Sequence, residues 1–191
     1  NNIKERYMNE TEMQRLMTAL LEHRDNNISR LARLILASGV RKNEALNAKW
    51  SDIDFNQRTW VIPKDNAKSK KADSIPLNST AIEVLKELRD GNENAYVFVN
   101  NASSERLKWV NKSWSRFREK IGLEDITLHQ LRSQFAYHLC SNHVEIYTVQ
   151  KLLRHADVRT TVDRYAHLST ESLELASSVA GDCITKAMRN I

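Results

Sequence analysis

A tyrosine, a histidine and several arginines lie close together near the C-terminal end of the sequence. The stretch Lys151–Leu168 reads KLLRHADVRTTVDRYAHL, and in it His155 and Tyr165 lie ten positions apart. An isolated tyrosine usually buries its ring in a core and hydrogen-bonds its hydroxyl. A phenol has an ordinary pKa of about 10 and becomes a nucleophile only beside a base or in a strongly positive field. Tyr165 is therefore a candidate nucleophile only if other charged residues join it.

Two upstream segments supply such residues. His129 and Arg132 lie three residues apart, which places both on one face of a helix. Arg41 lies two residues after Gly39 and precedes Glu44 at the spacing of a helical ion pair. Each pair alone is typical of an ordinary surface helix. Together, two guanidinium groups and two imidazoles can hold the anionic oxygens of a phosphodiester, because guanidinium binds phosphate through two parallel hydrogen bonds.

In order and spacing, these segments resemble the boxes of the tyrosine recombinase (phage integrase) family. The matching residues are SGVRKNEAL around Arg41, HQLR from His129 to Arg132, and LLRHADVRTTVDRYAHL at the C-terminal end. The resemblance extends from about Arg6 to His167. It implies a helical catalytic domain that cleaves and rejoins DNA strands without a metal or other cofactor.

The resemblance also implies six catalytic residues: Arg41, Lys68, His129, Arg132, His155 and Tyr165. Tyr165 would attack the phosphorus and form a 3′-phosphotyrosyl link. Arg41, Arg132 and His155 would stabilise the transition state. His129 would accept the phenol proton, and Lys68 would protonate the leaving 5′-hydroxyl.

Three features leave alternatives open. Lys68 stands eight positions before Pro76, but Lys70 lies in the same lysine-rich turn and is its nearest competitor. Arg154 occupies a position where the family mostly has glycine, so its side chain either contacts DNA or strains the turn. The spacing from His155 to Tyr165 is one residue longer than usual, and the turn between them must absorb it.

The rest of the sequence predicts the elements that position these residues. Four glycines and two prolines in 191 residues favour helix over a loop-rich or all-β fold. Apolar residues recur at helical spacing in several segments. The expected helices are 11–21, 28–38, a short one around 44–48, 80–89, 104–121, one capped by Thr127, and one ending near Leu153. Thr11 and Thr80 each begin a sequence that fits a capping box, and Gly39 fits a helix C-terminus.

Between residues 50 and 77 the pattern changes to short strands. Alternation at 53–55, Trp60–Ile62 and Ser74–Leu77 predicts a small antiparallel β-sheet, and 96–99 is a further candidate strand. The predicted fold class is mainly α (α+β), a single domain over 1–191. The family usually carries an additional N-terminal DNA-binding module, so we expect this chain to be a fragment of a longer protein.

The tail beyond the tyrosine has apolar residues at helical spacing from Ser172 on. We expect a C-terminal helix within 170–191. It either folds back on its own domain or docks on a neighbouring protomer, as the corresponding segment does in the family.

Charge and cysteine content limit the partners. The net charge of +5 permits a polyanionic partner without requiring one. Cys140 and Cys183 have no paired spacing, which fits a reducing cytoplasm. No apolar run reaches membrane-spanning length. The expected partners are double-stranded DNA, other copies of the chain on DNA (dimer to tetramer) and accessory DNA-bending proteins.

Three other functions fit parts of the pattern. A type IB topoisomerase uses the same covalent chemistry but relaxes supercoils by strand rotation. A non-catalytic DNA-binding module would keep the basic face without the nucleophile. In a helical domain that only binds other proteins, the matches to the family motifs would be coincidental.

Overall fold

The computed structural model describes residues 6–23, 26–67, 72–100, 102–165, 177–179, 181–182, 185–186 and 188. Its contacts divide the chain into two compact units, Asn1–Phe135 and Ala136–Ile191. The fold is mainly helical with one small antiparallel sheet, as the sequence predicts. In the described ranges, no helix is both long and apolar enough to cross a membrane.

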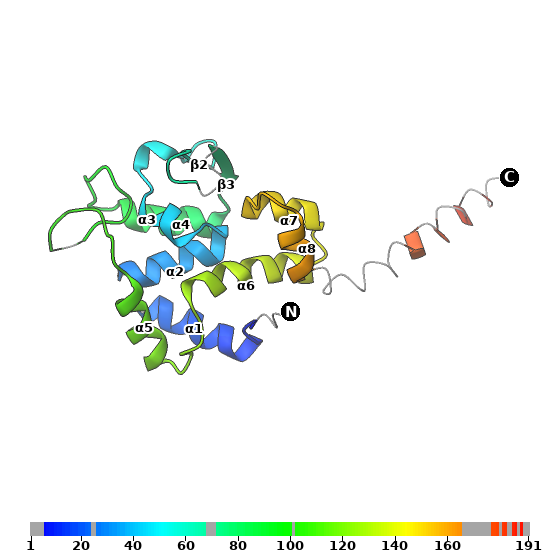
Figure 1. Ribbon diagram of the computed structural model, residues 1–191, viewed down its shortest axis with the longest axis horizontal. Coiled ribbons are helices and arrows are strands. Elements are labelled where there is room, and N and C mark those ends of the chain that lie inside the picture. Colours follow the sequence, from blue (N-terminus) through cyan, green and yellow to red (C-terminus); the bar gives the residue numbers. More distant parts are fainter. Residues whose placement is uncertain are drawn as a thin grey trace. The chain divides into compact units, whose positions relative to one another are not determined.

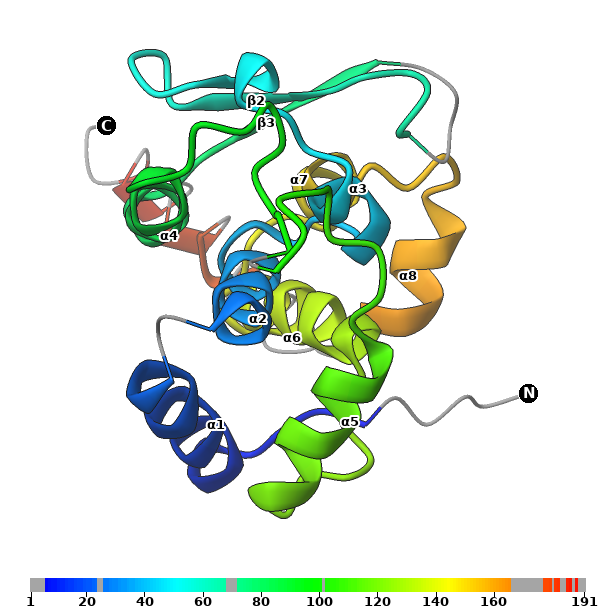
Figure 2. The same ribbon diagram turned by 90° about the vertical axis from the view of Figure 1, so that its left-hand side faces the viewer.

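The helices of the first unit are α1 (Glu10–Glu22), α2 (Asn27–Ser38), α3 (Lys42–Leu46), α4 (Ser79–Arg89), α5 (Asn111–Lys120) and the first part of α6 (Leu128–Ser141). Of these, α2 contacts α1, α3 and α4. In both ribbon views α2 and α4 lie side by side, and α1 and α5 lie at the end of the unit opposite the sheet (Figures 1 and 2). Arg15 on α1 donates to the carbonyl of Ile121 just beyond α5, at 3.3 Å.

A three-stranded antiparallel sheet follows a short 3-10 turn, η1 (Trp50–Asp52). Its strands are β1 (Ile53–Asp54), β2 (Thr59–Ile62) and β3 (Asp73–Pro76), in the order β1-β2-β3. Trp60 pairs with Ile75 across the β2–β3 ladder, and both side chains are buried. The hairpin between β2 and β3 contains the predicted Lys68, which lies outside the described residues.

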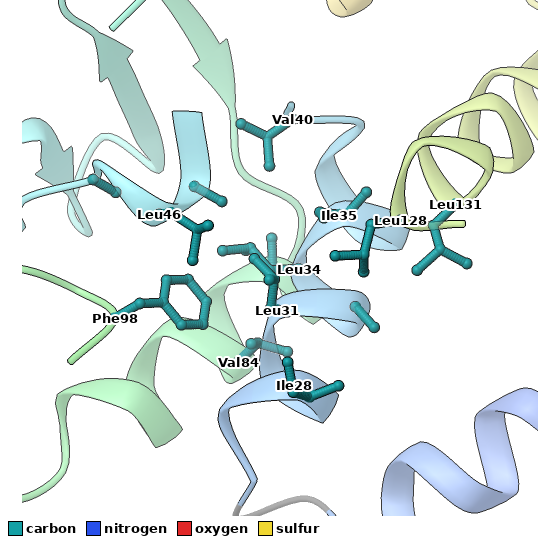
Figure 3. Packing of buried hydrophobic residues seen from close by; sticks show 14 of the residues in the cluster. Ile28, Leu31, Leu34, Ile35, Val40, Leu46, Val84, Phe98, Leu128 and Leu131 are labelled. Atoms are coloured by element: carbon teal, nitrogen blue, oxygen red, sulfur yellow. The ribbon is translucent and has the colours of Figure 1, made fainter. Parts of the chain in front are cut away.

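The core of the first unit forms on both sides of α2. Figure 3 shows Leu31 and Leu34 of α2 among Val84, Leu46 and Phe98, all of them buried. On another face of the same helix, Ile35 lies beside Leu128 and Leu131 of α6 (Figure 3). Full burial of such a side chain is worth about 1.5–3 kcal/mol. The residues that begin α6 are therefore fixed to the central helix by apolar contact.

Two helix starts differ from the prediction. Asn9, rather than Thr11, caps α1: its side chain accepts from the backbone N–H of Glu12 at 2.9 Å, and Glu12 accepts from Asn9 N–H at 3.0 Å. Asn78, rather than Thr80, caps α4. Each asparagine precedes the threonine in sequence and has the extended backbone that a cap requires, so the helix begins earlier.

The predicted helix 104–121 is wrong in its first part, because α5 begins only at Asn111. Arg106 instead forms a β-bridge with Val99, and the Leu107 N–H donates to the carbonyl of Phe98 at 2.9 Å. The candidate strand 96–99 takes part only in isolated bridges of this kind. These tertiary pairings override the helical spacing of Leu107 and Val110.

The beginning of α6 agrees with the prediction. Thr127 accepts from the N–H of Gln130 at 3.2 Å, and the Gln130 side chain accepts from the N–H of Thr127 at 2.7 Å. This reciprocal pair is the capping box read from the sequence. Further along α6, the buried Gln134 accepts from the N–H of Met8 at 2.9 Å and donates to its carbonyl at 3.4 Å, which holds the segment before α1.

The second unit contains the end of α6, α7 (Ile146–Leu153) and α8 (Arg159–Tyr165). Val149 and Leu153 of α7 are buried, and α7 contacts α8. Asp157 caps α8 by accepting from the N–H of Arg159 at 2.9 Å. The predicted helix within 170–191 falls largely outside the described residues.

Candidate active site

A pocket of about 670 Å³ opens in the first unit. This volume lies in the range of pockets that bind small ligands. The start of α3, the hairpin after β2, α5 and the start of α6 form its walls. Its polar and charged lining residues are Arg41, Lys42, Asn43, Glu44, Asn66, Asn111, Arg118, Thr127, His129 and Arg132.

Arg41 is positioned by the turn that joins α2 to α3. It is the N-cap residue of α3, and its backbone N–H donates to Glu44 Oε2 at 2.9 Å. Its Nη1 donates to Glu44 Oε1 at 2.8 Å. The side chain of Glu44 is only 2% exposed, whereas that of Arg41 is 24% exposed. The ion pair expected for a surface arginine is therefore present, but a buried carboxylate holds the guanidinium in the wall of a pocket.

Arg132 is held by the end of α2. Its residue is 3% exposed, and its Nη1 donates to the carbonyl oxygen of Gly39 at 2.5 Å. Gly39 has a left-handed backbone with φ of 64°, as predicted for a helix C-terminal glycine. This conformation directs its carbonyl toward α6. A backbone carbonyl that helix geometry leaves without a partner thus orients the second arginine.

His129 lies one helical turn before Arg132, at the exposed first turn of α6. The pocket thus brings together three of the six predicted catalytic residues, Arg41, His129 and Arg132. The predicted Lys68 directly follows Asn66 and Ala67, and both of these line the pocket. Lys68 itself is outside the described residues.

His155 and Tyr165 lie in the second unit. The half-buried His155 has its Nδ1 2.9 Å from Oγ1 of Thr161, which is fully buried. Its backbone N–H donates to the carbonyl of Gln150 at 3.2 Å, and the Gln150 side chain donates back to the His155 carbonyl at 3.0 Å. Three hydrogen bonds therefore fix both the backbone and the ring of this histidine.

Arg154 has a positive φ of 54° at the C-terminus of α7. For a residue with a Cβ this left-handed backbone is strained, and glycine would relieve it. The side chain is buried, and Nη1 donates to the carbonyl of Leu152 at 3.1 Å. This backbone fits the prediction of a strained turn at Arg154, while a contact of its side chain with DNA stays a prediction.

Tyr165 is the last residue of α8 and is 1% exposed. Between His155 and α8, the side chain of Asp157 accepts from the N–H of Arg159 at 2.9 Å. The hydroxyl of Tyr165 is closed to bulk solvent in this conformation.

Several pocket residues were not among the predicted site residues, including Lys42, Asn111, Trp114 and Arg118. The last three share one face of α5. The only available signal for Lys42 was its place next to Arg41. The three α5 residues lie within the predicted helix 104–121, but no motif there marked them as site residues. Arg118 donates to the carbonyl of Ile126 at 3.1 Å, and Trp114 donates to the same oxygen at 2.9 Å.

Comparison with known proteins gives a consistent result. The phage integrase family matches residues 6–172. Tyrosine recombinase XerA of Pyrococcus horikoshii is 32% identical over 159 residues, which cover 80% of this chain and 54% of XerA. The integrase of Salmonella phage P22 is 28% identical over 166 residues, covering 81% of this chain and 42% of that protein.

A solved structure agrees with these relatives. XerH site-specific recombinase, bound to its difH substrate before cleavage, superposes with a TM-score of 0.71 at 27% identity. The match covers 91% of this chain and 53% of XerH. The chain thus spans about half the length of the relatives it matches. The sequence boxes, the helical fold with its small sheet and these similarities agree, and the chain belongs to the phage integrase family as a tyrosine recombinase catalytic domain.

Proposed function

We propose that this chain is the catalytic part of a site-specific recombinase that cleaves and rejoins double-stranded DNA through a 3′-phosphotyrosyl intermediate. The observation that supports this most directly is the convergence of Arg41, His129 and Arg132 on one pocket. A pocket lined by two guanidinium groups and an imidazole is chemically suited to an anionic phosphodiester.

The two arginines act on the transition state. Attack at phosphorus places additional negative charge on the non-bridging oxygens, and Arg41 and Arg132 hold these oxygens with donors whose charge does not titrate away. His155 adds a third donor. Stabilisation of this type is often worth about 3–4 kcal/mol for each donor. Because Glu44 and the Gly39 carbonyl already orient the two arginines, little rearrangement is needed when the phosphate binds.

Tyr165 supplies the nucleophile. Its hydroxyl oxygen forms a bond to phosphorus while the bond from phosphorus to the 5′-oxygen breaks. His129 accepts the phenol proton, and Lys68 donates a proton to the departing 5′-oxygen. The phosphotyrosyl link retains the energy of the phosphodiester, so a 5′-hydroxyl from a second DNA strand reverses the reaction without ATP.

The test is covalent capture on nicked suicide duplexes drawn from a random sequence pool. We expect a denaturant-resistant protein–DNA adduct in the presence of EDTA, and sequencing the captured DNA identifies the preferred site. Tyr165→Phe should form no adduct and still bind DNA, because phosphate affinity comes from the cationic side chains. Arg41→Lys should lose about 10²–10³-fold in cleavage rate, since an ammonium cannot reproduce the bidentate fork.

The same experiment separates the alternative functions. A type IB topoisomerase would form the adduct and relax supercoiled DNA, but it would not exchange strands between two captured sites. DNA binding with no adduct from the unaltered chain would indicate a non-catalytic binding module. An adduct formed by Tyr165→Phe would refute the assignment of the nucleophile.

The assignment of Lys68 as the general acid has a separate test. Lys68→Ala should greatly slow cleavage of ordinary DNA. Its cleavage rate should recover on a substrate whose bridging 5′-oxygen is replaced by sulfur, because a thiolate leaves without a proton. Lys70→Ala is the matched control in the same turn. Selective rescue of Lys70→Ala instead would assign the acid to that residue.

We further propose that active copies assemble as dimers to tetramers on DNA, with the segment 170–191 docking on a neighbouring copy and accessory DNA-bending proteins assisting. Deleting 170–191 should leave DNA binding largely intact and disturb cooperative assembly on a captured site. Unfolding of the truncated chain would show that the segment belongs to its own core.

A further inference from the structure

Lys42 lies beside the predicted catalytic residues but is not one of them. It is the first residue of α3, it directly follows Arg41, and it is half-buried in the wall of the pocket. Its Nζ donates to Oδ1 of Asn111, the first residue of α5, at 3.2 Å. The two residues are 69 positions apart, so a tertiary contact directs this ammonium group.

The charge of Lys42 is not neutralised as that of Arg41 is. Glu44 forms an ion pair with Arg41, whereas no carboxylate of the described residues lies within ion-pair distance of Lys42. Asn111 is neutral and leaves two of the three ammonium donors for other acceptors. A positive charge in the first turn of a helix does not stabilise that helix. Neither the charge of Lys42 nor its position is explained by the stability of α3.

Arg118 extends this positive surface along α5. It lines the same pocket, and its Nη1 donates to the neutral carbonyl of Ile126. The pocket wall formed by Lys42, Asn111 and Arg118 is therefore cationic and contains a neutral amide. This chemistry suits an anion that arrives with the substrate.

DNA carries one phosphate for about every 3.4 Å of helix axis on each strand. A strand that places one phosphate between Arg41 and Arg132 must therefore bring the neighbouring phosphate close as well. The pocket, at about 670 Å³, is lined both by these arginines and by Asn111 and Arg118 of α5. It can hold more of the backbone than one phosphate group.

We propose that Lys42, directed by Asn111, binds a phosphate next to the cleaved one on the same DNA strand. This inference rests on the proposed function for the identity of the cleaved phosphate. Lys42 then fixes the register of the strand, so that the correct phosphorus lies between the two arginines. Phosphate contacts of this kind position a duplex without reading its bases.

The first measurement is the salt dependence of binding to a short duplex, with Tyr165→Phe protein so that no cleavage intervenes. Neutralising one phosphate contributes about 0.9 to the slope of log K against log salt. Lys42→Gln in this background should lower the slope by about that amount. Lys86→Gln removes the same charge from an exposed site on α4 outside the pocket, and it should leave the slope unchanged.

The second measurement uses the captured sequence with one phosphate at a time replaced by neutral methylphosphonate. With Lys42 present, affinity should fall when the phosphate next to the cleaved one is neutralised. The Lys42→Gln protein should be insensitive to that replacement, while Lys86→Gln should remain sensitive. Asn111→Ala should show a weaker form of the Lys42→Gln pattern, because the ammonium loses its direction but keeps its charge.

An unchanged salt slope, or equal sensitivity of both proteins at every phosphate, would overturn the subsite. Loss of cleavage by Lys42→Gln at saturating DNA that a bridging sulfur restores would also overturn it, because Lys42 would then be the general acid. If the unaltered chain forms no adduct, the proposed function fails, and the salt slope on the uncleaved duplex still decides the phosphate contact.

Discussion

Replacing Gly39 by alanine should destabilise the first unit and disturb Arg132 at the same time. Gly39 has φ of +64°, a conformation that costs an alanine about 1–2 kcal/mol. A Cβ at this position would lie 2.5 Å and 2.7 Å from Cδ1 and Cε1 of Phe135. Relief of such an overlap typically costs a further 1–3 kcal/mol. The free energy of unfolding should therefore fall by about 2–5 kcal/mol.

Gly91 provides a control that separates the two costs. It has nearly the same backbone, with φ of +66°, but nothing lies within 4 Å of the added Cβ. Gly91→Ala should therefore lose only the backbone part, about 1–2 kcal/mol. Urea unfolding followed by tryptophan fluorescence measures both variants, because all four tryptophans, at positions 50, 60, 109 and 114, lie in the first unit.

The overlap also predicts a functional effect. The carbonyl of Gly39 accepts the hydrogen bond that orients Arg132, so a shift of either α2 or α6 moves the guanidinium. Single-turnover cleavage by Gly39→Ala should fall even where the variant is fully folded. Phe135→Leu added to Gly39→Ala should restore part of the stability and leave the backbone cost. If Gly39→Ala is no less stable than Gly91→Ala, the close approach of Phe135 does not constrain this turn.

Three further predictions concern single contacts. Thr161→Val should remove the hydrogen bond to His155, at a cost of about 0.5–1.5 kcal/mol, and should change the tautomer populations of the His155 ring in ¹⁵N NMR spectra. Thr161→Ser should retain both the bond and the populations. Identical spectra for the two variants would contradict the contact. Arg154→Ala should be less stable than Arg154→Gly by about 1 kcal/mol in hydrogen exchange of α7, because both lose the guanidinium and only glycine relieves the positive φ. Hydrogen bonds from Arg6 and the cap backbone lower the pKa of Glu12 from 4.5 to about 2, so its stabilising effect is complete above pH 4.5 and is lost as the pH falls toward 2. Glu12→Gln should therefore be less stable than the unaltered chain at neutral pH, and denaturation curves should show this difference shrinking through that pH window.

The sequence predicts most strongly where one local rule decides the outcome. The left-handed Gly39 follows from the chemistry of helix ends, and the Thr127–Gln130 capping box needs only the spacing of two residues. The two wrong caps show the limit of such rules. Asn9 and Thr11 both suit a cap, and the choice depends on which backbone is extended.

Contacts between distant segments were beyond the reach of sequence reasoning. Nothing near Arg106 indicates that it pairs with Val99 and donates to the side chain of Asn47, and these contacts remove residues 104–110 from the predicted helix. The same limit applies to the pocket. Arg41 and Arg132 could be predicted from their motifs, but the meeting of Lys42 with Asn111 depends on how α3 and α5 are arranged in the folded unit.

The two units divide the proposed chemistry in a way that suits control of cleavage. The arginines proposed to bind phosphate belong to the first unit, where Glu44 and Gly39 hold them on a packed core. The proposed nucleophile, Tyr165, belongs to the second unit and ends a helix of seven residues, and it is 1% exposed. A short helix depends on its tertiary contacts, so a modest change at α8 is sufficient to expose the hydroxyl. Under the proposed function, we therefore expect phosphate binding to precede exposure of Tyr165, so that a DNA strand is attacked only after both have occurred.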